Sequence, residues 1–235
     1  MFATATRSMR RLGALLFSAL ALLPAGAADL TKIEQRWLQG AAPVLEFARQ
    51  HKLPLDIIVQ PNPLPGVAPL ALAYIKGRCK LVLSMRGNPE AQATLERIEP
   101  ELLDAALEMM AAHELGHCRR YVDGAWHGLP AGFSAPDASV VSPELRATYL
   151  GMRAARREEG YADLVGLAWI EQRRPREYAR LYAWLRAERE RDLLPGSHHD
   201  TLAWLDLSRS GVARGADSIF GAAQPMWTAG LAVED

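Results

Sequence analysis

The residues best suited to chemistry lie in the stretch MMAAHELGHCRRY, residues 109–121. His113, Glu114 and His117 form the pattern H-E-x-x-H within it. Residues four apart on a helix lie on one face, so the imidazoles of His113 and His117 would project into one small volume. Two neutral imidazoles at that spacing supply half of a tetrahedral zinc site. Glu114 beside them could take a proton from a water on the metal.

An accidental match stays open, because a helix with two partly buried histidines shows the same spacing. A third ligand would distinguish a zinc site from an accidental match. Candidate acidic residues lie in the stretch AARREEGYADLVGLAWIE. Glu159 and Asp163 lie four residues apart and share a helical face. This predicts Glu159 as the third ligand and Asp163 as the acceptor of a hydrogen bond from a ligand histidine. Glu158 is the competing ligand, although Arg156, Arg157 and Glu158 have the character of a solvated charged turn.

The elements that would position these residues begin with a helix over 30–51. Its apolar residues recur at three- and four-residue spacing, and Pro43 marks a bend or a break. The stretches LPLDIIVQ and APLALAYIKGRCKLVLSMRG predict three short strands, the last two joined by a turn at Lys76-Gly77-Arg78. A helix from Glu99-Pro100 to about Tyr121 would carry the two histidines.

The rest of the chain is predicted to be helical over 144–173, 175–193 and from 201 onward. A Gly-, Pro- and Ser-rich loop over 123–143 precedes these helices and could form a lid or a wall of a cleft. We therefore expect an α+β fold, mostly helical, with a small strand layer before the H-E-x-x-H helix. No linker divides residues 28–235, so we expect a single domain there.

The N-terminus has the pattern of a targeting segment. Three arginines precede an apolar run over 12–23, which ends in the small residues Ala25-Gly26-Ala27. This predicts a signal peptide over 1–27 and a periplasmic or secreted mature chain. An uncleaved anchor is the alternative, although the run is shorter than the roughly 20 residues that span a bilayer. No second run is long enough, so we expect no stable membrane insertion after cleavage.

Charge and cysteine content narrow the class of protein further. The chain has 27 Lys and Arg against 27 Asp and Glu, without a long run of one sign. Nucleic-acid binding needs a basic patch or stripe, so we expect no nucleic-acid partner. Two cysteines, Cys79 and Cys118, could form one disulfide in an oxidising compartment or remain two buried thiols.

The combined motifs resemble those of a known group. His113-Glu114-x-x-His117 followed by Glu159-x-x-x-Asp163 is similar to the motif set of the gluzincin clan of zinc metallopeptidases. Thermolysin-like and CAAX-protease-type peptidases belong to that clan, and E-G-Y-A-D resembles the E-x-x-A-D form of the second group. The resemblance implies a zincin-like domain, a zinc ion, and a peptide or protein substrate held on an edge strand, for which CKLVLSMRG is the candidate.

The resemblance is incomplete outside the motif helices. CAAX-protease-type peptidases carry a His-Pro pair after the third ligand and often have transmembrane helices, whereas GSHHDTLAWL has His198 and His199 without a proline. One of these histidines could stabilise an oxyanion, but the Pro-Gly-Ser turn before them favours two exposed turn residues. Tyr161 is a weaker oxyanion candidate that fits better as a core residue, and His127 fits a loop.

On this basis we expect a secreted zinc-dependent metallopeptidase. His113, His117 and Glu159 would bind zinc with a water in the fourth position. Glu114 would take a proton from that water and deliver it to the leaving amine, while Asp163 orients a ligand histidine. The alternative is a non-catalytic zinc-binding protein of the envelope with an assembly or chaperone-like role. Glu114 argues for the enzyme, because a structural zinc does not need it.

Overall fold

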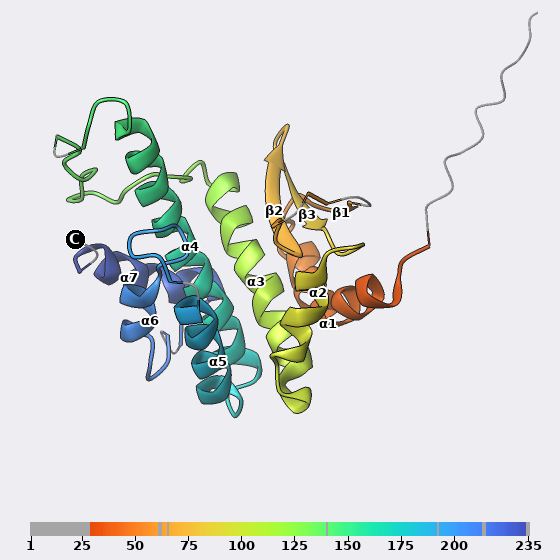
Figure 1. Cartoon of the computed structure of the whole chain (residues 1–235). Helices are drawn as coiled ribbons and strands as arrows, with labels where there is room; N and C mark the ends of the chain where they lie inside the picture. Colours follow the sequence, from red (N-terminus) through yellow and green to blue (C-terminus); the bar gives the residue numbers. More distant parts are fainter. Residues whose placement is uncertain are drawn as a thin grey trace, which may run out of the picture.

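The computed structural model describes residues 29–60, 63–64, 66–139, 141–191, 193–212 and 215–233 (Figure 1). The predicted signal peptide therefore lies outside the described residues. In chain order the elements are α1 (Lys32–Gln50), β1 (Leu55–Val59), β2 (Leu70–Ile75), β3 (Arg78–Leu83), α2 (Pro89–Glu96), a 3-10 turn (Pro100–Leu102), α3 (Leu103–Val122), α4 (Arg146–Arg173), α5 (Tyr178–Arg191), α6 (Leu202–Leu207) and α7 (Ile219–Leu231). The fold is mixed α+β, with a small three-stranded sheet. Among the described helices, none combines the length and apolar character needed to cross a membrane.

Helix α1 begins with a reciprocal cap. The side chain of Thr31 accepts from the backbone N–H of Glu34, and the Glu34 carboxylate accepts from the backbone N–H of Thr31 at 2.7 Å. Arg86 then pairs with the buried Glu34 carboxylate at 2.8 Å and ties the segment after the sheet to the start of α1. The helix continues through Pro43 to Gln50, so the break that Pro43 could have marked does not occur.

The sheet has the strand order β1-β3-β2, with β3 parallel to β1 and antiparallel to β2. The predicted hairpin is confirmed, and Lys76 and Gly77 both adopt positive φ, at 50° and 78°. The stretch CKLVLSMRG contains most of β3, which is the central strand, so its assignment as an edge strand is wrong. The parallel pairing with β1 occupies its second edge. Strand β2 is the edge nearest to α3 in Figure 1.

A disulfide joins the sheet to α3. Cys79 on β3 and Cys118 on α3 are bridged with an S–S distance of 2.00 Å, and both side chains are fully buried. The sequence left open one disulfide or two buried thiols, and the structure has the disulfide. Cys118 directly follows His117, so the disulfide holds the histidine-bearing helix against the strand layer.

Helix α3 lies between the sheet and α4 (Figure 1). Two glycines let α3 and α4 approach closely. A Cβ at Gly116 would lie 2.9 Å from Cα of Ala162, and one at Gly166 would lie 3.0 Å from the carbonyl oxygen of Met109. Because their backbones nearly touch here, the histidine face of α3 meets the acidic face of α4.

Candidate metal centre

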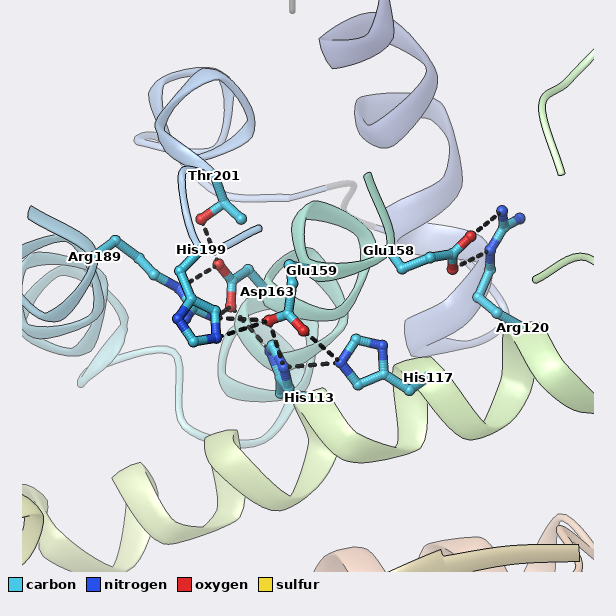
Figure 2. Close-up of polar contacts among 9 residues, drawn as sticks. All are labelled: His113, His117, Arg120, Glu158, Glu159, Asp163, Arg189, His199 and Thr201. Atoms are coloured by element: carbon cyan, nitrogen blue, oxygen red, sulfur yellow. Dashed lines mark hydrogen bonds and ion pairs between the residues drawn. The ribbon is translucent and has the colours of Figure 1, made fainter. Parts of the chain in front are cut away.

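Three side chains from two helices converge in the contact between α3 and α4 (Figure 2). Nε2 of His113 lies 3.1 Å from Nε2 of His117. The Glu159 carboxylate lies opposite, with Oε2 3.4 Å from Nε2 of His113 and Oε1 3.3 Å from Nε2 of His117. The structure thus brings together the three residues that the motifs predicted as ligands.

These distances suit a metal ion. Ligand atoms at about 2.0–2.1 Å from a tetrahedral zinc are about 3.3 Å apart, close to all three separations. His113 Nδ1 lies 2.9 Å from Asp163 Oδ1. When His113 is neutral, an Nδ1–H donated there leaves Nε2 with a lone pair that faces His117. Lone pairs that face one another are stabilised by a cation between them. The group His113, His117 and Glu159 can therefore hold a metal ion.

Asp163 is the buried anchor of His113. Its carboxylate is 1% exposed and also accepts hydrogen bonds from Thr201 Oγ1 at 2.6 Å, and from Arg189 Nη2 at 2.6 Å and Nε at 2.9 Å. Burial alone would raise the pKa of Asp163, but Arg189 and the His113 hydrogen bond outweigh it and hold the pKa well below its usual range. Asp163 therefore stays ionised and fixes the ring of His113.

The surroundings of the ligands favour positive charge. Burial alone would lower the pKa of His113, but its hydrogen bonds to Asp163 and Glu159 outweigh burial and raise that pKa to about 10. Burial likewise opposes ionisation of Glu159, yet the two histidines hold its pKa well below the usual value. The same carboxylates that attract a proton to His113 would attract a metal cation.

Glu114 lies on α3 beside the ligands and does not join them. Its side chain is 8% exposed, and no hydrogen bond or ion pair to its carboxylate occurs within the described part of the chain. Burial raises the pKa of Glu114, although the positive charge of His113 and His117 would act against it. A buried carboxylate without a fixed partner is available to accept a proton.

Glu158 has a different partner and is not part of the cluster (Figure 2). Its carboxylate makes two hydrogen bonds of 2.9 Å to Arg120, and it is 1% exposed. Arg156 and Arg157 are also buried, so the expectation of a solvated charged turn at Arg156, Arg157 and Glu158 is wrong. Helix α4 is enclosed by α3, α6 and α7, which leaves no solvated face at this point.

The other candidates are spread over three places. Nε2 of His199 lies 4.0 Å from Oε2 of Glu159, with its side chain 57% exposed, so this residue does reach the edge of the cluster. His198 packs on His199 with ring centroids 4.0 Å apart. Tyr161 is buried and its hydroxyl donates to the Phe220 carbonyl at 3.5 Å, as expected for a core residue. His127 lies in the loop after α3.

Sequence reasoning missed Arg189. This residue lies on α5, thirty positions after Glu159, and its guanidinium Nη2 approaches Oε2 of Glu159 at 3.5 Å. It stands in the arginine- and glutamate-rich run RAERERD, where its neighbours look alike. No local signal separates it from them, because only the packing of α5 on α4 selects it.

No protein-family model, curated protein or solved structure matches this chain.

Proposed function

We propose that this chain is a zinc-dependent metallopeptidase of gluzincin type with a zincin-like fold, exported from the cytoplasm, that hydrolyses peptide bonds. One observation carries the proposal. The ligand-like cluster of His113, His117 and Glu159 lies beside Glu114, a buried carboxylate without a partner in the described residues. A structural zinc site requires no such carboxylate, whereas metal-assisted hydrolysis requires a proton acceptor.

Zinc is the proposed ion, because two histidines and a carboxylate with one open position form a donor set typical of catalytic zinc. When bound, zinc polarises the scissile carbonyl and lowers the pKa of a water molecule. Glu114 would accept a proton from the attacking water and deliver it to the leaving amine. A carboxyl group whose pKa is raised by burial is better matched to both steps than a solvated one.

The remaining polar residues would orient the ligand His113 and stabilise charge that develops on the substrate. Asp163 holds the His113 ring through a 2.9 Å hydrogen bond, and Arg189 and Thr201 in turn hold Asp163. Partial desolvation and the nearby positive charge of Arg189 lower the pKa of His199 to about 4, so its imidazole is neutral at physiological pH. A neutral imidazole at the exposed rim can donate one N–H to the oxyanion that forms on the substrate.

Export to the periplasm or beyond is supported by the disulfide between Cys79 and Cys118, because such bridges persist in oxidising compartments. The expected signal peptide over 1–27 fits that location. A non-catalytic assembly or chaperone-like protein would bind the same metal, and Glu114 distinguishes the two.

The direct experiment is digestion of an unfolded polypeptide by zinc-loaded protein and by its Glu114→Gln variant. The proposal predicts cleavage by the parent chain and loss of at least about a hundredfold in the variant, with zinc retained in both. Equal cleavage by the two proteins, each purified free of contaminating peptidases, would remove Glu114 from the mechanism. Zinc binding without cleavage of any polypeptide would favour the non-catalytic alternative.

A further inference from the structure

Four aromatic rings lie one on another beside the candidate metal centre. Tyr74 on β2 stacks on Tyr121 of α3 with centroids 4.8 Å apart and planes at 8°. Tyr121 stacks on Trp126 at 3.8 Å and 13°, and Trp126 on His127 at 5.0 Å and 26°. These four residues are called the aromatic column below. It runs from the edge strand of the sheet to the turn after α3.

The column adjoins a predicted metal ligand. The Trp126 ring packs against His117 with centroids 5.6 Å apart and planes at 73°. Nδ1 of His117 is buried and has no hydrogen-bond partner in the described residues, whereas Nδ1 of His113 lies 2.9 Å from Asp163. Trp126 is only partly buried and Tyr74 is 37% exposed. Accessible aromatic surface therefore lies next to a predicted metal ligand.

A buried ion pair holds the turn that carries Trp126. The Glu158 carboxylate accepts from the backbone N–H of His127 at 2.8 Å, and Arg120 donates to the carbonyl of Gly128 at 2.9 Å. His127 has a φ of 60°, which is uncommon for a residue other than glycine. Glu158 is 1% exposed and Arg120 7% exposed, so their pairing removes two charges from water at considerable desolvation cost.

Within the described residues, the hydrogen bonds of Arg120 and Glu158 join the two side chains to each other and to the turn at His127 and Gly128, and none reaches a metal ligand. The ion pair holds the backbone at His127 and Gly128, and the Trp126 ring is packed between Tyr121 and His127. Rigid aromatic surface binds with a smaller loss of entropy than mobile surface. Because Arg120 neutralises Glu158, the column offers no free carboxylate there to attract a cationic side chain.

We propose that the aromatic column is a substrate subsite that receives an aromatic side chain of a peptide bound at the metal centre. Arg120 and Glu158 are positioning residues that act through the turn carrying Trp126. The inference that the ligand is a peptide rests on the proposed function, whereas the inference that it carries an aromatic group rests on the column itself. Aromatic rings prefer offset-stacked or edge-to-face contacts with other rings, and Tyr74 and His127 at the two ends of the column are exposed.

Binding is measured with the zinc-loaded Glu114→Gln protein, which would not consume its ligand. The probes are acetylated, amidated alanine hexapeptides in which one phenylalanine moves through the six positions, with hexa-alanine as reference. Calorimetry should show at least one position that binds about tenfold tighter than the reference, a difference within the range of an aromatic contact. Adding Trp126→Ala should reduce that ratio to about one.

Trp184→Ala in the same background is the matched control, because Trp184 is also partly buried. It lies on α5 five residues before Arg189, a rotation of about 140° away from the face that reaches the metal centre. The phenylalanine preference should persist in this control. A preference lost in both variants, or unchanged in Trp126→Ala, overturns the proposal.

Cleavage of the same peptides by the parent protein separates this proposal from the proposed function. Cleavage without any phenylalanine preference would support the peptidase function and overturn the aromatic subsite. If the peptides bind with a Trp126-dependent phenylalanine preference but are not cleaved, the aromatic subsite stands and the peptidase function is overturned. Trp126-dependent binding of an N-acetylglucosamine disaccharide in place of the peptides would overturn the peptide assignment and identify a sugar subsite.

Glu158→Gln tests the positioning role. It keeps an acceptor for the His127 N–H but weakens the contact with Arg120, so KM for the preferred peptide should rise about threefold or more while kcat stays within about twofold. Zinc content should remain that of the parent. Loss of zinc together with activity would show that Glu158 only supports the metal centre, and would overturn its assigned role.

Discussion

Glu158 and Glu159 are adjacent on α4, yet Glu159 faces the two histidines while Glu158 pairs with Arg120 (Figure 2). A rotation of about 100° per helical residue separates their side chains. Glu159→Ala should therefore lose the metal, and Glu158→Ala should keep it. Metal per folded chain, measured after removal of any unfolded fraction, compares the two.

The unfolded fraction must be removed because breaking the buried pair of Arg120 and Glu158 should cost about 3–5 kcal/mol of stability. Circular dichroism must show that Glu158→Ala is folded at the measuring temperature. The opposite pattern, with metal retained in folded Glu159→Ala and lost in folded Glu158→Ala, would move the ligand assignment by one residue.

Removing the anchor of His113 should weaken metal binding without abolishing it. Asp163→Asn keeps the shape of the side chain but loses its charge, and an outer partner of a ligand histidine is typically worth about 10–100-fold in affinity. Competition with a chelator measures the change. Thr201→Val removes only the 2.6 Å hydrogen bond to Asp163 and should have a smaller effect. Unchanged affinity in Asp163→Asn would contradict the role of Asp163.

Metal affinity should rise with pH. The pKa of His113 in the metal-free chain is about 10, since its hydrogen bonds to Asp163 and Glu159 outweigh burial. At neutral pH a metal ion must therefore displace a proton from His113, and affinity should increase about tenfold per pH unit between about pH 6 and 8. Calorimetry in buffers of different ionisation enthalpy should detect about one released proton. An affinity independent of pH over this range would contradict a protonated His113.

The close contact of α3 and α4 should be needed for the metal centre. Gly116→Ala places a Cβ 2.9 Å from Cα of Ala162 and forces the helices apart, so both stability and metal affinity should fall. Gly151→Ala is the matched control, because Gly151 also lies in a helix but has open space around its Cβ position. That change should raise stability by up to about 1 kcal/mol. Equal effects of the two substitutions on metal affinity would contradict the requirement for close packing.

The disulfide should contribute strongly to stability. It closes a separation of 39 residues, for which the chain-entropy model gives about 4 kcal/mol. Urea unfolding of the Cys79→Ala/Cys118→Ala variant, compared with the oxidised parent, measures that contribution. Non-reducing mass spectrometry of the parent should show a linked Cys79–Cys118 peptide pair. Two freely alkylated thiols in the folded parent would contradict the bridge.

Local patterns were enough to predict helices α1, α3, α4 and α5, the hairpin and the helical faces of the metal cluster. The short helix α2 was not predicted, and the helical section expected from residue 201 onward is two separate helices, α6 and α7. His113 and His117, like Glu159 and Asp163, share a face through a four-residue spacing, which a single sequence displays directly. The burial of Asp163 also had a local signal, because this acid stands within an apolar run. These predictions depend on the local geometry of one helix or one turn at a time.

What the sequence could not supply depends on contacts between distant segments. Strand order depends on pairing between β1 and β3, and so the edge strand was misassigned. Glu158 looked solvent-exposed because its partner, Arg120, lies 38 residues earlier on another helix. Arg189 cannot be distinguished from the other arginines of its run by sequence, because only the packing of α5 on α4 brings it to the metal centre. Residue type alone carries no information on such partners.

Metal content tests the central claim most directly. The purified chain, reconstituted with zinc and freed of excess metal, should hold about one zinc per molecule, and His117→Ala prepared in the same way should hold almost none. Folding of the variant, checked by circular dichroism, ensures that loss of metal reflects loss of a ligand. No zinc on the folded parent, or equal zinc on parent and variant, would contradict a metal centre at His113, His117 and Glu159.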